Sequence, residues 1–86
     1  MNTNQIATVF NRAYHGQRNL MTPTVLEWGE KGKLLYELSE GPGIWTPKIY
    51  GVTILTKTGD KRPELSSCFN DVTEALQYIE ALEDAE

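Results

Sequence analysis

The side chains that could supply a nucleophile and a base are Cys68 and His15, the only cysteine and the only histidine in the 86 residues. A catalytic Cys/His pair needs an activated thiolate and a third group that orients the base. Cys68 falls in an expected edge strand without a basic neighbour in sequence, and His15 falls at the end of an expected helix. We therefore expect a buried or half-buried structural thiol and a histidine favoured by the helix dipole. An enzyme that uses these residues is the least favoured hypothesis.

Four carboxylates of the expected last helix are candidates for metal ligands or for an acid–base pair. They are Glu74, Glu80, Glu83 and Asp84. Metal sites on helices usually combine carboxylates with histidine or draw them from facing helices, and the sequence offers neither arrangement. We expect no metal and no cofactor. A solvated helix face is one interpretation of these acids, and a contact surface for a basic protein is the other.

Charge is divided unevenly along the chain, whose net charge is −4. All eight basic residues and five of the acidic residues precede Pro63. The chain from Pro63 onward contains seven acidic residues and no basic residue. The C-terminal end of a helix disfavours anions, so the acids at positions 80, 83 and 84 do not stabilise their own helix. This asymmetry favours an acidic surface that binds a protein partner with a basic surface.

The other candidate for a binding site is Trp45. It lies in the segment Gly41–Pro47, which is too rich in glycine and proline for a helix or a strand. The glycines lack the following Lys-Ser/Thr of a phosphate-binding loop, so nucleotide binding is not expected. An aromatic side chain held between two prolines is typical of a protein-binding hot spot. The alternative is that Trp45 folds back as a lid over the edge of the sheet.

The first element that positions these residues is expected over residues 4–15. Apolar side chains recur there three, four and seven residues after the first, which predicts one face of a helix that ends at Gly16. They are Ile6, Val9, Phe10 and Ala13. Several side chains in this segment are β-branched and lose rotamer freedom in a helix, so a strand is the alternative.

Three further segments have the composition of strands. Thr24–Trp28 and Lys33–Ser39 are expected to form a hairpin across Gly29–Gly32, because two glycines flanking a polar pair supply the positive φ of a tight turn. Lys48–Lys57 is the clearest strand. Its alternating residues on one face are Tyr50, Val52 and Ile54. Residues 64–69 form either a short edge strand or an irregular segment.

The last helix is indicated most clearly. Asp71, followed three residues later by Glu74, resembles a capping box. The apolar stripe that follows at helical spacing consists of Val72, Ala75, Leu76, Ile79 and Leu82. We expect this stripe to cover one face of the sheet, with Leu76 and Ile79 nearly fully buried.

Together these elements predict one α+β domain over residues 1–86. Its antiparallel sheet has three or four strands, with the C-terminal helix on one face and an N-terminal helix, in the order αβββ(β)α. Leu35 and Leu55 fall on the strand face opposite the main stripe, which therefore needs the N-terminal helix or a second subunit. A small domain with a thin core and no disulfide often gains stability by association, so a homodimer is an accompanying hypothesis.

Several classes of protein are not expected. The first residues lack the basic and apolar regions of a signal peptide, and no apolar run reaches the ~20 residues that span a bilayer. We expect a cytoplasmic protein without membrane association. The element order resembles that of double-stranded-RNA-binding domains, whose second helix presents lysines to phosphates. Asp71 and Glu74 stand at the corresponding positions, so direct binding of nucleic acid is not expected.

The sequence therefore predicts a non-enzymatic accessory protein that acts by binding another protein. Small size, acidity and the lack of a catalytic constellation are typical of proteins encoded by phages and other mobile elements. That class includes anti-CRISPR inhibitors, which act on nucleic-acid-handling machines. A homodimer that binds a small molecule is the alternative. The residues predicted to contact a protein partner are Glu74, Glu80, Glu83, Asp84 and Trp45.

Overall fold

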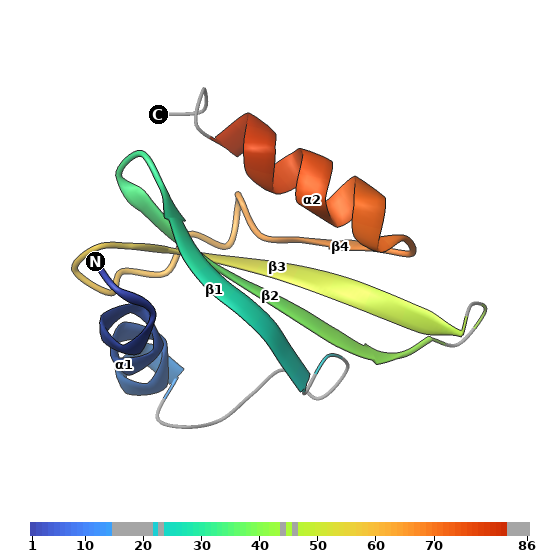
Figure 1. Ribbon diagram of the computed structural model, residues 1–86, viewed down its shortest axis with the longest axis horizontal. Coiled ribbons are helices and arrows are strands. Elements are labelled where there is room, and N and C mark those ends of the chain that lie inside the picture. Colours follow the sequence, from blue (N-terminus) through green and yellow to red (C-terminus); the bar gives the residue numbers. More distant parts are fainter. Residues whose placement is uncertain (15–21, 23, 44, 46, 83–86) are drawn as a thin grey trace.

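The computed structural model describes residues 1–14, 22, 24–43, 45 and 47–82. In chain order, its elements are α1 (Thr3–Tyr14), β1 (Thr24–Lys31), β2 (Leu34–Pro42), β3 (Lys48–Thr56), β4 (Ser67–Phe69) and α2 (Val72–Ala81). The four strands form one antiparallel sheet in the order β1-β2-β3-β4. The helices lie on opposite faces of this sheet (Figure 1). The predicted α+β fold with the order αβββ(β)α is confirmed.

The face of the sheet under α2 holds an apolar core. Successive side chains of a strand point to opposite faces, so alternating residues of β2 and β3 meet α2 together. Ala75, Ile79 and Leu82 recur every three or four residues and therefore lie on one side of the helix. The buried members of this core are Leu34, Leu38, Val52, Ile54, Ala75, Ile79 and Leu82.

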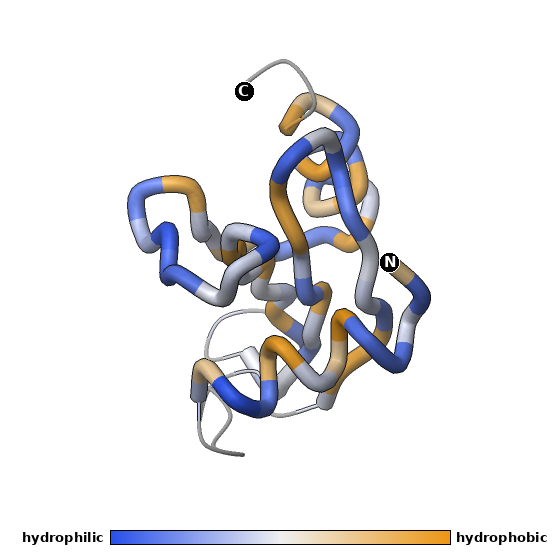
Figure 2. Tube along the Cα trace, turned by 90° about the vertical axis from the view of Figure 1, so that its left-hand side faces the viewer, coloured by the Kyte–Doolittle hydropathy of each residue, from blue (hydrophilic) through white to orange (hydrophobic). Residues whose placement is uncertain are grey.

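The opposite face is covered by α1. Leu35 and Leu55 pair across β2 and β3 and are fully buried together with Ile6 and Phe10 of α1. Leu35 is an exception to the alternation of apolar and polar residues in β2 because it belongs to this second core. Hydrophobic and hydrophilic residues alternate along α1 (Figure 2), as expected for a helix that buries one side. The N-terminal helix therefore covers the leucines for which a second subunit was the alternative.

The two helices are short. The structure has a 12-residue helix at Thr3–Tyr14, which decides between the helix and the strand expected over residues 4–15. α2 has 10 residues, and the side chain of Asp71 caps it by accepting a hydrogen bond from the backbone N–H of Thr73 at 2.8 Å. Among the described residues, no helix is long and apolar enough to cross a membrane.

The predicted β1–β2 turn was placed too early. β1 continues to Lys31, and the turn consists of Gly32 and Lys33, with Gly32 at a φ of 58°. Gly29 instead lies inside β1 opposite Tyr36. A Cβ on Gly29 would stand 2.4 Å from the tyrosine ring, so this glycine is required by a close ring contact and not by a turn.

The segment 64–69 is a strand only at its end. β4 begins at Ser67, and the residues before it form a turn in which the backbone N–H of Leu65 donates to the carbonyl of Arg62. Pro63 lies within that turn and has no N–H to offer a ladder. The strand pairs with Tyr50, Gly51 and Val52 of β3.

The prediction that Leu76 is nearly fully buried was wrong. Ile79 is 3% exposed, as expected, but Leu76 is 44% exposed. Each helical residue turns by about 100°, so Leu76 lies on the flank of the stripe centred on Ala75 and Ile79. α2 packs mainly on β3 and β4, and its other flank carries Tyr78 against Leu65 and Phe69. The flank with Leu76 therefore stays open to solvent.

Candidate protein-binding surface

Trp45 is held in the connection between β2 and β3. β2 ends at Pro42 and β3 begins at Lys48, and these two residues form the last pair of the ladder. An ion pair between Lys48 and Glu40, 3.6 Å from nitrogen to oxygen, lies at the base of the connection. Trp45 itself is 94% exposed. The alternative in which its side chain folds back as a lid over the sheet edge is therefore wrong.

The exposure of Trp45 is unlike that of the other exposed apolar side chains. Met1, Leu26 and Leu76 are 44–48% exposed, so each keeps about half of its surface on the protein. Single apolar side chains at a surface are ordinary, but an indole offers 150–250 Å² to a partner. Removing that area from water is worth roughly 4–6 kcal/mol at about 25 cal/mol/Å², before the entropic costs of association are subtracted. Trp45 therefore has the largest apolar area available for binding among the described residues.

Glu80, one of the acids predicted to contact a partner, does not lie near Trp45. Glu74 and Glu80 are both exposed on α2, but six residues of helix place them about a third of a turn apart. The carboxylate of Glu80 lies 3.5 Å from the Nζ atom of Lys31, at the end of β1. Glu83 and Asp84 lie outside the described residues.

Trp45 and the Lys31–Glu80 pair lie at opposite ends of the sheet. Lys31 pairs with Leu34 at one end of β2, and Lys48 pairs with Pro42 at the other. The nine residues of β2 between these ends span about 27 Å at ~3.3 Å per residue. Of the predicted contact residues, Trp45 and Glu80 therefore lie on separate surfaces, one apolar and one charged.

Most of the described basic residues lie at the Lys31 end, where acids accompany them. Lys57 follows β3, and Lys61 forms a bridge with Leu55. Glu30 accepts from the amino group of Met1 at 2.6 Å and pairs with Lys57 at 2.9 Å. The bond from the Met1 amino group, followed by that from Lys57, lowers the pKa of Glu30 to about 2.

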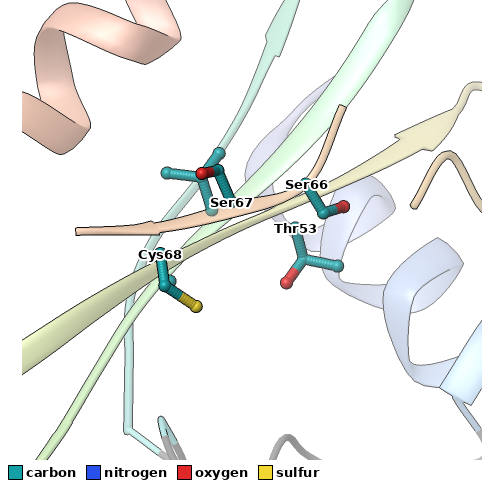
Figure 3. A pocket seen from close by; sticks show the side chains of 6 residues that line it. Thr53, Ser66, Ser67 and Cys68 are labelled. Carbon is teal, nitrogen blue, oxygen red and sulfur yellow. The ribbon is translucent and has the colours of Figure 1, made fainter. Parts of the chain in front are cut away.

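Cys68 lines a small pocket between β3 and β4. The pocket has a volume of about 140 Å³ and is lined by Gly51, Val52, Thr53, Ser66, Ser67 and Cys68. In Figure 3 the thiol of Cys68 and the hydroxyl of Thr53 point to the same side of the strands, while Ser67 points to the other. Pockets for small molecules usually measure about 300–1,000 Å³, so this one is too small to support the small-molecule alternative.

The lining of that pocket does not provide a base for the thiol. Cys68 is exposed, so the expectation of a buried or half-buried thiol was wrong. None of the six lining residues is basic. The hydroxyl of Ser66 accepts from the backbone N–H of Ile54 at 3.1 Å and donates to the carbonyl of Arg62 at 3.2 Å. It therefore completes the edge of β3 and is not free to act as a nucleophile. His15 lies outside the described residues.

Sequence reasoning missed a buried polar cluster beneath α1. Glu37 is only 6% exposed, and the indole N–H of Trp28 donates to its carboxylate at 2.8 Å. Burial, followed by the negative charge of Glu37, raises the pKa of Tyr14. Ser39 is also buried, and its hydroxyl donates to Thr22 at 3.0 Å. The signal was present in the strand alternation, because Glu37 and Ser39 share the face of Leu35.

We interpret this cluster as structural, because its hydrogen bonds stabilise polar groups buried in the fold. A buried carboxylate needs hydrogen bonds to offset the loss of water, and the Trp28 indole supplies one of them. Among the described residues, no group of three His, Cys, Asp or Glu side chains could hold a metal ion.

Comparison with known proteins found no significant match to this chain. No protein-family model matches the chain. No curated protein and no solved structure is significantly similar to it.

Proposed function

We propose that this chain is a non-enzymatic accessory protein that acts by binding another protein, with Trp45 as the anchor. The observation that supports this function best is the 94% exposure of Trp45 in the connection between two paired strands. The ladder pair at its base and the nearby prolines limit the conformations that the loop can adopt. Less conformational entropy is then lost when the indole enters an apolar pocket of the partner.

The acidic residues of α2 have a different role in this proposal. Glu80 presents its carboxylate beside Lys31, at the other end of the sheet from Trp45, Glu74 is exposed on α2, and the net charge of the chain is −4. Such charges attract a basic partner from a distance and raise the association rate at low salt. The partner is therefore a protein with an apolar pocket and a basic surface, as in the nucleic-acid-handling machines that proteins of phages and mobile elements inhibit.

The role of Trp45 is tested by affinity capture from a lysate of the source organism. The immobilised wild type is compared with Trp45→Ala and with a matched control, Leu76→Ala, which also truncates an exposed apolar side chain. We expect one set of proteins to be retained by the wild type and by the control and to be lost with Trp45→Ala. If Trp45→Ala retains the same proteins, the anchor lies elsewhere.

The role of the acids is tested on the captured partner with the variant Glu80→Lys/Glu83→Lys/Asp84→Lys. We expect the association rate to fall several-fold at 50 mM salt and the difference from the wild type to shrink at high salt. Because Glu80 also pairs with Lys31, the melting temperature of each variant is measured alongside. An unchanged association rate at 50 mM salt would remove the acids from the proposal.

A further inference from the structure

The pocket between β3 and β4 has the size of a single aromatic ring. Its volume is about 140 Å³, and an engineered protein cavity of about 150 Å³ holds one molecule of benzene. Gly51 stands opposite Cys68 in the ladder and contributes no side chain that would fill the space. The pocket is therefore too small for a typical ligand but large enough for one aromatic side chain.

The lining of the pocket suits an indole. In Figure 3 the thiol of Cys68 and the hydroxyl of Thr53 point to the same side of the strands. A sulfur atom makes favourable contacts with an aromatic ring. A buried indole N–H usually has an acceptor, and the hydroxyl oxygen of Thr53 can accept. None of the six lining residues is charged, so a neutral ring enters the pocket without removing an ion from water.

The chain carries such a ring on its own surface. Trp45 is 94% exposed, so its indole does not occupy the pocket of its own chain. The loop that holds it is closed by the pair of Pro42 and Lys48. Gly51 follows Lys48 by three residues of β3, which is about 10 Å at ~3.3 Å per residue. The loop and the pocket therefore lie near the same end of β3.

We propose that Trp45 enters this pocket in a second copy of the chain, while its own pocket receives Trp45 of that copy. A two-fold axis makes the two insertions equivalent, because each contact in such an interface occurs twice. The proposal rests on the proposed function, since the indole hidden in the dimer is the anchor for the protein partner. Dimer and complex are then mutually exclusive, and the partner competes with the second copy for Trp45.

The buried area is that of a weak dimer. An indole offers roughly 150–250 Å², and a pocket that encloses it loses a similar area, so two insertions bury roughly 600–1,000 Å² in total. Stable complexes usually bury at least about 1,200 Å². A single insertion buries only half as much, which favours the reciprocal dimer over an open chain of copies. We expect a dissociation constant on the order of 10–100 µM, weak enough for a partner to displace the second copy.

Sedimentation of the full chain from 1 to 300 µM tests the dimer in the absence of any partner. Trp45→Ala removes the ring, and Cys68→Leu fills the pocket from an exposed position. Each should raise the dissociation constant at least tenfold. Cys68→Ser keeps the pocket open, and Leu76→Ala truncates an exposed side chain on α2. These two variants are the matched controls and should dimerise as the wild type does.

The thiol of Cys68 reports on the pocket directly. With N-ethylmaleimide in excess, we expect the reaction of Cys68 to slow as the protein concentration rises through the range of the dimer, because the indole of the second copy covers the thiol. In Trp45→Ala the reaction rate should not depend on the protein concentration. A rate in the wild type that is equally independent of concentration, while sedimentation shows a dimer, would place the interface elsewhere and overturn the proposal.

Two further outcomes of sedimentation overturn the proposal. One is a wild type that stays monomeric at 300 µM, and the other is a dimer that Trp45→Ala or Cys68→Leu leaves intact. Neither touches the proposed function, which is decided by whether Trp45→Ala loses the captured proteins. Cys68→Leu frees Trp45 and should retain the same proteins as the wild type. If it loses them, the pocket binds the partner instead of a second copy, and the proposal fails.

Discussion

The two faces of the sheet are filled by different means. Under α2, seven buried apolar residues from β2, β3 and α2 with its C-cap residue make one continuous core. Under α1, a smaller core built on Leu35 and Leu55 adjoins a polar half that contains Glu37 and Ser39. Each face is covered by one short helix, and each helix covers only part of its face. The comparison shows that a thin core can be completed with hydrogen bonds where apolar volume is insufficient.

The difference has a consequence for substitutions. Apolar packing is not directional, so a lost methyl group leaves a cavity whose lining relaxes in part. A buried hydrogen bond is directional, and the loss of one partner leaves the other without water or protein to replace it. Substitutions on the α1 face can leave either a cavity or an unpaired buried polar group, whereas substitutions on the α2 face leave mainly cavities.

The largest effects are expected from truncating the central apolar residue of each face. Phe10 is 0% exposed and Ile79 is 3% exposed. Phe10→Ala should lower the free energy of unfolding by roughly 3–5 kcal/mol and Ile79→Ala by roughly 2–5 kcal/mol. Urea denaturation measures both, with Gln77→Ala on the exposed side of α2 as the control. If Ile79→Ala melts within a degree or two of the wild type, α2 does not pack as described.

A smaller loss is expected from the polar half of the α1 face. Trp28→Phe keeps a ring but removes the donor to the buried carboxylate of Glu37, which should cost about 1–3 kcal/mol. The matched substitution on the α2 side is Tyr78→Phe, which removes a hydrogen bond to the neutral carbonyl of Leu65 and should cost about 0.5–1.5 kcal/mol. Urea denaturation measures both losses of unfolding free energy. Equal losses would show that removing a donor from the buried carboxylate costs no more than removing one from a neutral carbonyl.

The open flank of α2 should tolerate truncation. Leu76 is 44% exposed, so Leu76→Ala should lower the free energy of unfolding by less than about 1 kcal/mol, as surface substitutions do. Ile79→Ala, three residues along the same helix, is the comparison. A loss at Leu76 as large as that at Ile79 would mean that α2 is rotated about its axis relative to the structure.

The smallest effect is a pH dependence at Glu30, which joins the start of α1 to the end of β3. Its pKa falls from 4.5 to about 2 in the folded chain, so below pH 4.5 the unfolded chain binds more protons at this group. The stabilisation is present above pH 4.5 and is lost as the pH falls towards 2. Thermal melts should show a shallower loss over this window in Glu30→Gln than in the wild type. A slope in Glu30→Gln as steep as that of the wild type would contradict this prediction.

Much of the fold was determined by local pattern. The stripe from Ala75 to Leu82 and the cap at Asp71 specify α2, because helical spacing and a side-chain acceptor for the first N–H groups are properties of neighbouring residues. The alternation in β2 and β3 likewise specifies which residues share a face. Even Leu35, the exception in its strand, indicated a second covered face.

The candidate site was predictable in part. The glycine- and proline-rich segment around Trp45 identified a loop, but its sequence allowed both an exposed indole and a lid. The structure places the indole in solvent, because β2 and β3 continue to the base of the loop and no described element covers it. The charge pattern predicts an acidic surface but not its distance from Trp45, and the length of β2 separates Glu80 from Trp45.

Sequence by itself determined the elements, their order and the faces of the strands, because each depends on residues within a few positions of one another. Tertiary structure alone decided how the helices are placed across the sheet. α2 settled over β3 and β4, which left Leu76 exposed, and the ring of Tyr36 settled over β1, which requires a glycine at position 29. These outcomes depend on volumes that meet across the sheet, and residues distant in sequence supply those volumes.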